Sequence, residues 1–246
     1  MLHKFLLAIG VSTAAADGLA GTSRNVHAYF ANWALYHAGD YAYTADKLAP
    51  ISQKLGNLNY AFMYFCPPPG TNPMPYWAQP PYGSCSDASA FQLMSVEPHD
   101  VSFLSTINGF KASNPGLKLY LSVGGWNFPS AYFSAMAATS ATRATFIASV
   151  VQWLQTYSAD GIDIDWEYPC SAPRADPVEI SCTDFQTVAD AGGNCPADTT
   201  NSLALFKELS VALTPLGKLV SAASQAGKPQ EVEENIAAIW PYVDHL

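Results

Sequence analysis

An acidic stretch set among apolar residues constrains the fold of this chain more than any other feature. The segment "DGIDIDWEYP", Asp160–Pro169, places four carboxylates among Ile, Trp and Tyr residues. Successive side chains of a β-strand point to opposite faces, so Asp163, Asp165 and Glu167 share one face and the apolar residues between them share the other. We therefore expect a strand whose apolar face packs against helices and whose acidic face points into a barrel.

The three alternate carboxylates predict a specific chemistry. Like charges a few ångströms apart raise one another's pKa, so at least one carboxyl group should hold a proton near neutral pH. A protonated acid beside an ionised one suits general-acid cleavage of a glycosidic bond. A solvated acidic surface would not alternate with Ile and Trp in strand register, and a calcium loop would show Gly and Asn at turn positions. Asp160 precedes Gly161 and is expected to shape the turn that enters the strand.

Short apolar runs alternate with segments of helical periodicity along the chain. The predicted strands are Val26–Trp33, Leu58–Phe65, Leu117–Val123, Gly161–Trp166 and Leu219–Ala223. The predicted helices are Asp100–Ala112, Ser140–Tyr157, Asn201–Leu213 and Glu231–Ile239. This alternation predicts an α/β fold with parallel strands. The first strand is not followed by the Gly-rich loop of a nucleotide-binding sheet, which favours a barrel.

Two irregular inserts, Cys66–Pro98 and Pro169–Thr200, follow predicted strands. Loops at the carboxyl ends of barrel strands build the binding site of such folds, so these inserts predict an elaborated site. Tyr76, Trp77 and Tyr82 either stack on sugar rings or pack the first insert against its own disulfide, and both readings stay open.

The cysteines fall into two groups. Cys66 and Cys85 bracket the first insert and predict a local disulfide. Cys170, Cys182 and Cys195 share the second insert, and one of these three has no partner within the chain. No spacing of Cys and His suits zinc, so we predict neither a metal nor a cofactor.

The amino terminus resembles a signal peptide over residues 1–16. A basic start at Lys4 precedes an apolar run, and Ala14 and Ala16 form a small-residue cleavage site. A buried first helix is the alternative, and the run is too short to span a bilayer. Residues 17–246 would then form the mature, secreted, extracellular domain, in keeping with the cysteines.

Composition limits the partners. The formal net charge of -9 disfavours nucleic acid and anionic membranes, and a neutral or cationic ligand fits better. The chain is 49% hydrophobic over 246 residues, which suits one large domain, and we expect a monomer.

The acidic segment resembles the DxxDxDxE signature of family 18 glycoside hydrolases, the chitinases. Further segments agree with that family in order: "YFANW", "NYAF", "SVGGW", "LVSAASQA" and "YVDHL". The resemblance implies a (β/α)8 TIM barrel, of which this chain holds about strands one to five and the start of the sixth. From this incompleteness we expect little activity and poor folding of the chain as given.

The resemblance also implies roles for single residues. Glu167 matches the general acid, Asp165 the carboxylate that orients the N-acetyl group of the substrate, and Asp163 the residue that shares a proton with Asp165. The acetamide oxygen then attacks the anomeric carbon, which gives substrate-assisted retaining catalysis.

Further positions match the sugar-binding residues of the family or lie beside them in its motifs: Tyr29, Phe62, Gly125, Trp126 and Tyr168. Core packing is the alternative for the aromatic residues. It is weakest for Trp126, because Gly124 and Gly125 leave room for a ligand beside it.

The implied function is hydrolysis of β-1,4-linked N-acetylglucosamine in chitin or chitooligosaccharides. Two alternatives are a lectin-like protein that binds chitin without turnover, and an endo-β-N-acetylglucosaminidase that acts on N-glycans. The retained Glu167, Asp165 and Asp163 favour catalysis over the lectin. The run Trp166–Pro169 favours a chitinase over the N-glycan enzyme.

Overall fold

The protein is described by a computed structural model at residues 26–167, 169, 197–224 and 236–246. Its central sheet has neighbouring strands in the order β1-β2-β4-β5-β6, and all of these pairings are parallel. The strands are β1 (His27–Ala31), β2 (Asn57–Phe65), β4 (Lys118–Gly124), β5 (Gly161–Asp165) and β6 (Leu219–Ala222). All five predicted strands are therefore present, in the order expected of an α/β barrel.

The sheet separates an apolar outer face from a polar inner face. On β4, Leu119, Leu121 and Val123 are fully buried in the hydrophobic core, whereas Tyr120 and Ser122 alternate with them and point the other way. The same alternation holds on β5, where the isoleucines join the core and the aspartates do not. Side chains that carry chemistry thus collect on the inner face.

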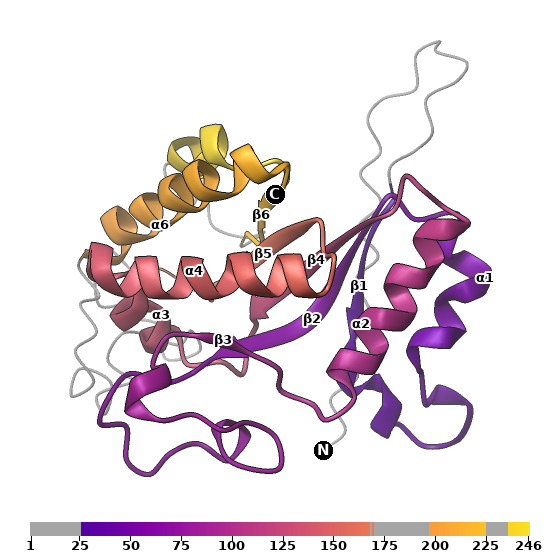
Figure 1. Ribbon diagram of the computed structural model, residues 1–246, viewed down its shortest axis with the longest axis horizontal. Coiled ribbons are helices and arrows are strands. Elements are labelled where there is room, and N and C mark those ends of the chain that lie inside the picture. The colour runs from indigo at the N-terminus through magenta and orange to yellow at the C-terminus, as the bar shows by residue number, and fades with distance from the viewer. Residues whose placement is uncertain (1–25, 168, 170–196, 225–235) are drawn as a thin grey trace, which may run out of the picture.

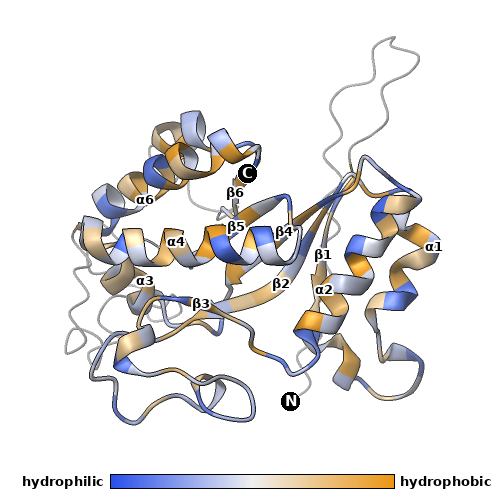
Figure 2. Cartoon of the chain, viewed as in Figure 1, coloured by the Kyte–Doolittle hydropathy of each residue, from blue (hydrophilic) through white to orange (hydrophobic). Residues whose placement is uncertain are grey.

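Helices lie against the sheet, as Figure 1 shows for α2, α4 and α6. Their bounds are α2 (Asp100–Gly109), α4 (Ser140–Thr156) and α6 (Asp198–Leu213), and the predictions for these three helices are confirmed. Phe146, Val150 and Leu154 recur at every fourth position of α4 and are fully buried. Figure 2 shows hydrophilic and hydrophobic residues together on α4 and α6, as expected for helices that pack on one side only. Residues 236–239 are also helical, at the end of the predicted helix Glu231–Ile239, whose first part lies outside the described residues.

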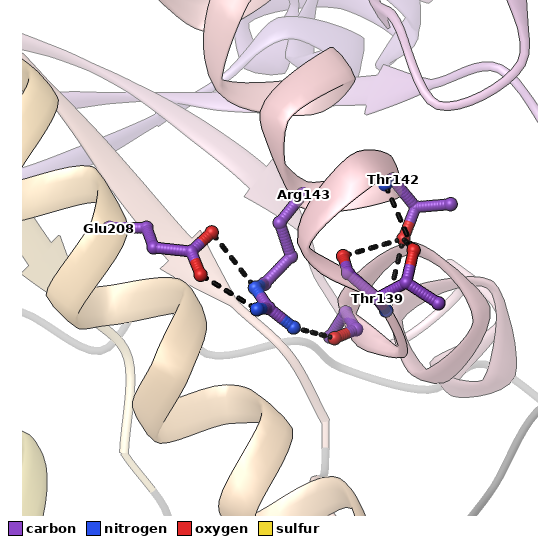
Figure 3. Close-up of polar contacts among 5 residues, drawn as sticks. Thr139, Thr142, Arg143 and Glu208 are labelled. Carbon is purple, nitrogen blue, oxygen red and sulfur yellow. Dashed lines mark hydrogen bonds and ion pairs between the residues drawn. The ribbon is translucent and has the colours of Figure 1, made fainter.

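An ion pair joins α4 to α6 beside the start of α4 (Figure 3). The Arg143 guanidinium donates to both carboxylate oxygens of Glu208, at 2.9 and 2.6 Å, and to the carbonyl of Ala137 at 2.7 Å. Thr139 caps α4, because its hydroxyl accepts the backbone N–H of Thr142 at 3.1 Å. These contacts fix α4 and α6 relative to each other behind β5 and β6.

The first insert is anchored by the predicted disulfide between Cys66 and Cys85. Its far end forms the short strand β3 (Leu93–Met94), which pairs antiparallel with β2. Trp77 is only 6% exposed and packs on Tyr64, so it belongs to the core rather than to a sugar-binding surface. The packing interpretation therefore holds for Trp77. It does not hold for Tyr76 and Tyr82, which stay exposed.

Two features differ from the prediction. The first strand ends at Ala31, not Trp33, because a 3-10 helix, Asn32–Tyr36, turns the chain there. The buried Asn32 amide donates to the carboxylate of Asp100 at 2.9 Å, a contact between distant parts of the sequence. Two helices were not predicted, α1 (Ala49–Ser52) and α3 (Ser130–Ala137). Every residue of α3 is buried, so it has no polar face to reveal helical periodicity.

The last residues begin another parallel neighbour of β6. The backbone N–H of Ala222 donates to the carbonyl of His245 at 3.2 Å, and the N–H of Asp244 donates to the carbonyl of Val220 at 2.7 Å. A bridge between Ser221 and His245 has parallel sense. This is the predicted start of the sixth barrel strand.

Asp160 has the structural role expected from its position before β5. Its carboxylate accepts the backbone N–H of Leu119 at 2.8 Å and pairs with Lys111 at 2.5 Å. The proposed signal peptide, the cysteines of the second insert and Tyr168 lie outside the described residues. Across the described ranges, no helix combines the length and the hydrophobicity needed to cross a bilayer.

Candidate active site

The centre of the site is Asp163, on the inner face of β5. Parallel register places Ser122 of β4 on one side of it and Ser221 of β6 on the other. The Ser122 hydroxyl donates to Asp163 Oδ2 at 2.7 Å and the Ser221 hydroxyl donates to Oδ1 at 2.7 Å. All three residues are almost completely buried. The sheet register thus holds this carboxylate from both sides.

A third hydroxyl reaches Asp163 from β1. The phenol of Tyr29 donates to Asp163 Oδ2 at 3.0 Å. Burial, followed by the charges of Asp163 and Asp165, raises the pKa of Tyr29, so the phenol stays protonated and acts as a donor. Tyr29, predicted as a sugar-binding residue, therefore also contacts the acidic strand.

Asp165 ends β5 two residues further along the same face and is 8% exposed. Burial, followed by the charges of Glu167 and Asp163, raises the pKa of Asp165 to about 8. Its carboxyl group is therefore mainly protonated at neutral pH. This agrees with the prediction that one carboxyl of the three holds a proton.

Glu167 lies in a bend just beyond the end of β5 and is half-buried. The preceding Trp166 turns to the other side, where its ring stacks on Phe133 at 5.3 Å and its indole N–H donates to Ser130 at 2.7 Å. Because Trp166 is anchored to α3, the backbone that carries Glu167 starts from a fixed point. We call Asp163, Asp165 and Glu167 the acidic row. Glu167 is its partly exposed member, which suits a group that must meet a ligand.

Two consecutive glycines after β4 allow other groups to approach closely. Gly124 and Gly125 have φ values of +112° and +85°. A Cβ atom at Gly125 would lie 2.5 Å from the ring of Phe62, and one at Gly124 would lie 2.3 Å from the carbonyl oxygen of Asp165. That carbonyl accepts the N–H of Gly125 at 2.9 Å. Because these two positions have no side chain, the end of β5 and the Phe62 ring of β2 can both lie close to this turn.

Aromatic residues gather near the carboxyl ends of β1, β2 and β4. Phe62 stacks on Trp33, with ring centroids 5.7 Å apart and planes inclined by 19°. Trp33 is 43% exposed, and Trp126, next to Gly125, is 51% exposed. Large aromatic side chains left open to solvent at the carboxyl ends of barrel strands are typical of a ligand site rather than of a core.

The described residues hold no cluster of three or more His, Cys, Asp or Glu side chains arranged for a metal ion. Both carboxylate oxygens of Asp163 accept hydrogen bonds from the surrounding hydroxyl groups. The raised pKa of Asp165 and the partial exposure of Glu167 suit acid–base work by protein groups.

Comparison with known proteins gives the family. The sequence profile of glycosyl hydrolases family 18 matches residues 25–246. The chain belongs to glycosyl hydrolases family 18.

The relatives that match this chain include several chitinases. Chitinase A1 of Niallia circulans is 28% identical over 92% of this chain and 34% of its own length. The crystal structure of the Group IV chitinase of Ostrinia furnacalis is 25% identical, with a TM-score of 0.64 over 89% of this chain and 48% of that chain. Chitinase ChiA74 of Bacillus thuringiensis is 25% identical, with a TM-score of 0.65 over 91% of this chain and 38% of that chain. This family 18 chain therefore spans between a third and a half of these chitinases.

Sequence reasoning missed three residues of this family 18 site. Ser122 and Ser221 are the polar side chains next to Asp163 in register, and both interrupt apolar strands, which is the signal that could have revealed them. Trp33 was assigned to the first strand, although it stacks on Phe62 beyond the strand end. Its place depends on the turn that Asn32 makes, which the local sequence does not specify.

Proposed function

We propose that the protein is a secreted chitinase that hydrolyses β-1,4 bonds between N-acetylglucosamine units with retention of configuration. The observation that carries this proposal is the acidic row Asp163, Asp165 and Glu167 at the carboxyl end of β5, with Asp163 fixed by three hydroxyls. The chitinase relatives support it. Secretion is supported by the amino-terminal sequence and by the disulfide of the first insert.

The acidic row divides the work of bond cleavage. Glu167, the partly exposed member, protonates the glycosidic oxygen as general acid. The N-acetyl carbonyl oxygen of the substrate attacks the anomeric carbon from the opposite face and forms an oxazolinium ion. Water, activated by the Glu167 carboxylate, then opens that ion with overall retention. No protein nucleophile is needed.

Asp165 and Asp163 together stabilise the positive charge that forms when the acetamide attacks. Burial is the main cause that raises the pKa of Asp165 to about 8, so in the free protein the Asp165 carboxyl group holds a proton. Asp165 lies between Asp163 and Glu167 in the acidic row. When the acetamide N–H meets Asp165, that proton is shared toward Asp163, and the charge left on Asp165 stabilises the positive oxazolinium ion. The three hydroxyl donors hold Asp163 in the orientation that this transfer requires.

The aromatic residues beside the acidic row supply sugar binding. Phe62 lies against Gly125 and the exposed Trp126 follows it in sequence, and aromatic rings at these positions suit the apolar faces of pyranose rings. Tyr29 serves both functions, since it borders the site and donates to Asp163. Tyr168 is proposed as a further sugar contact on its sequence position alone.

The alternatives have less support. A lectin-like role would not require the complete acidic row or the buried hydroxyl set around Asp163. An N-glycan-cleaving enzyme is not favoured by relatives that are chitinases.

The mechanism predicts a strict requirement for the N-acetyl group. In a form of the protein that carries the complete barrel, we expect hydrolysis of chitotetraose and no cleavage of the fully deacetylated glucosamine tetramer, because the deacetylated sugar lacks the attacking carbonyl oxygen. Product formation from both tetramers can be followed by chromatography at pH 6. Comparable cleavage of the two tetramers would exclude substrate assistance, and no cleavage of either would contradict the proposed activity.

A further inference from the structure

Two polar residues accompany Tyr29 on the inner face of the sheet. His27 lies two positions before Tyr29 on β1, and Asn59 of β2 pairs with Tyr29 in register. The Nε2 atom of His27 lies 3.2 Å from Oδ1 of Asn59, and Asn59 is only 2% exposed. Neither residue takes part in bond cleavage, so their place beside Tyr29 calls for another explanation.

The Asn59 side chain also reaches the phenol of Tyr29. Burial is the main cause that raises the pKa of Tyr29, and a hydrogen bond from the Asn59 side chain acts in the opposite direction. A hydrogen bond lowers the pKa of a phenol when it is donated to the phenol oxygen, because it then stabilises the charged form. The Asn59 amide nitrogen therefore faces Tyr29, while the amide oxygen faces His27.

This arrangement sets the direction of each hydrogen bond as far as Asp163. An amide oxygen only accepts and an amide nitrogen only donates. His27 therefore donates to the amide oxygen of Asn59, and the amide nitrogen donates to the phenol oxygen of Tyr29. The phenol keeps its single proton for Asp163 Oδ2, at 3.0 Å. If the amide turned over, its oxygen would compete with Asp163 for that proton.

His27 holds the amide in this orientation only when its Nε2 atom carries a proton. Burial, followed by the neighbouring His245, lowers the pKa of His27, whereas the hydrogen bond to Asn59 and the charge of Asp163 have smaller, opposite effects. The two imidazole rings meet edge to face at 5.2 Å, and the ring of Tyr120 lies 5.8 Å from His27. The His27 ring is therefore uncharged near neutral pH, and the Asn59 oxygen selects the tautomer with the proton on Nε2.

We propose that His27 and Asn59 are positioning residues, which act through the Tyr29 phenol to direct a hydrogen bond onto Asp163. This inference rests on the proposed function for the role of Asp163 in catalysis. It extends the site from the acidic row to a pair of polar side chains on the inner face of β1 and β2.

The tautomer of His27 tests the direction of the hydrogen bonds without any substrate. In a form of the protein that carries the complete barrel, long-range 1H–15N NMR spectra at pH 8 should show the His27 proton on Nε2. The signals of His27 are those that His27→Leu lacks. A proton on Nδ1 would overturn the proposal, because Nε2 would then accept from the Asn59 amide and turn the amide oxygen toward Tyr29.

Asn59→Asp tests the effect on catalysis in the same form of the protein. The carboxylate has the size of the amide but only accepts, so it draws the phenol proton away from Asp163. We expect kcat for chitotetraose to fall by about tenfold to a hundredfold, with KM within about threefold of wild type. In a Tyr29→Phe background the same change should lower kcat by less than about a further twofold, because the phenol through which it acts is absent.

Asn57→Asp is the matched control. It adds the same charge to the same face of β2, but Asn57 lies 3.3 Å from the His245 ring rather than beside Tyr29. This variant should keep kcat within about twofold of wild type. Thermal melts that match wild type show that each variant is folded, and the His27 tautomer alone decides if Asn59→Asp does not fold.

The possible results separate this inference from the catalytic proposal. An equal loss of kcat from Asn59→Asp with and without the Tyr29 phenol would overturn the inference, and so would an equal loss from Asn57→Asp. Hydrolysis of chitotetraose by wild type is measured separately. A His27 proton on Nε2 in a protein without hydrolysis would support the hydrogen-bond direction and refute the chitinase.

Discussion

In a form of the protein that carries the complete barrel, replacing Glu167 with glutamine is expected to lower kcat for a chitooligosaccharide by about a hundredfold to ten-thousandfold. Glutamine has the size of glutamate but cannot give a proton to the leaving oxygen. The backbone before it is held by Trp166, through the stack on Phe133 and the hydrogen bond to Ser130, so the variant should fold normally. Steady-state kinetics on chitotetraose measure the loss.

Binding distinguishes a lost acid from a damaged site. Calorimetric titration of Glu167→Gln with chitotetraose should give a Kd within a few-fold of the wild-type KM, because the aromatic residues are unchanged. Asp40→Asn is the control: it removes one carboxylate charge at an exposed position of the 3-10 helix Gly39–Tyr41, and should keep kcat. Normal turnover by Glu167→Gln would remove this residue from the role of acid.

Asp165→Asn is expected to make the protein more stable at pH 8 by a few kcal/mol. Burial, followed by the charges of Glu167 and Asp163, raises the pKa of Asp165 in the folded protein to about 8 from the ordinary aspartate value of 3.8. Between these two values the folded state binds more protons than the unfolded state, so the free energy of unfolding falls as pH rises from about 4 to about 8. Asparagine carries no charge to bury, so the variant escapes this loss.

Urea unfolding at pH 4, 6 and 8 measures the difference. The curves of wild type and Asp165→Asn should nearly coincide at pH 4 and separate in favour of the variant as pH rises. The same variant should lose turnover, since its amide cannot share a proton with Asp163. A constant stability difference across the three pH values would contradict the proposed burial of charge at this position.

Much of the fold follows from local pattern. The strands alternate apolar residues with inward side chains, and α4 repeats Phe146, Val150 and Leu154 at helical spacing, so both kinds of element are visible in the sequence. The acidic row is visible for the same reason, because two-residue periodicity puts Asp163 and Asp165 on one face of β5.

Contacts between distant segments could not be predicted from the local sequence pattern. The end of β1 depends on the hydrogen bond from Asn32 to Asp100, and the partners of Asp163 depend on the register of β4 and β6 with β5. The roles of Trp77 and Tyr76 differ although they are adjacent, because only the packing of Phe128 and Tyr64 decides which ring is covered. The candidate site thus depends partly on strand periodicity, which the sequence shows, and partly on strand register, which it does not.

The configuration of the first product tests the central claim most directly. Chitotetraose cleaved in an NMR tube should first release the β-anomer at the new reducing end, and the α-anomer should grow only later by mutarotation, because attack by the acetamide and then by water inverts the anomeric carbon twice. Initial release of the α-anomer would show a single direct attack by water. That result would contradict a substrate-assisted mechanism built on Asp163, Asp165 and Glu167.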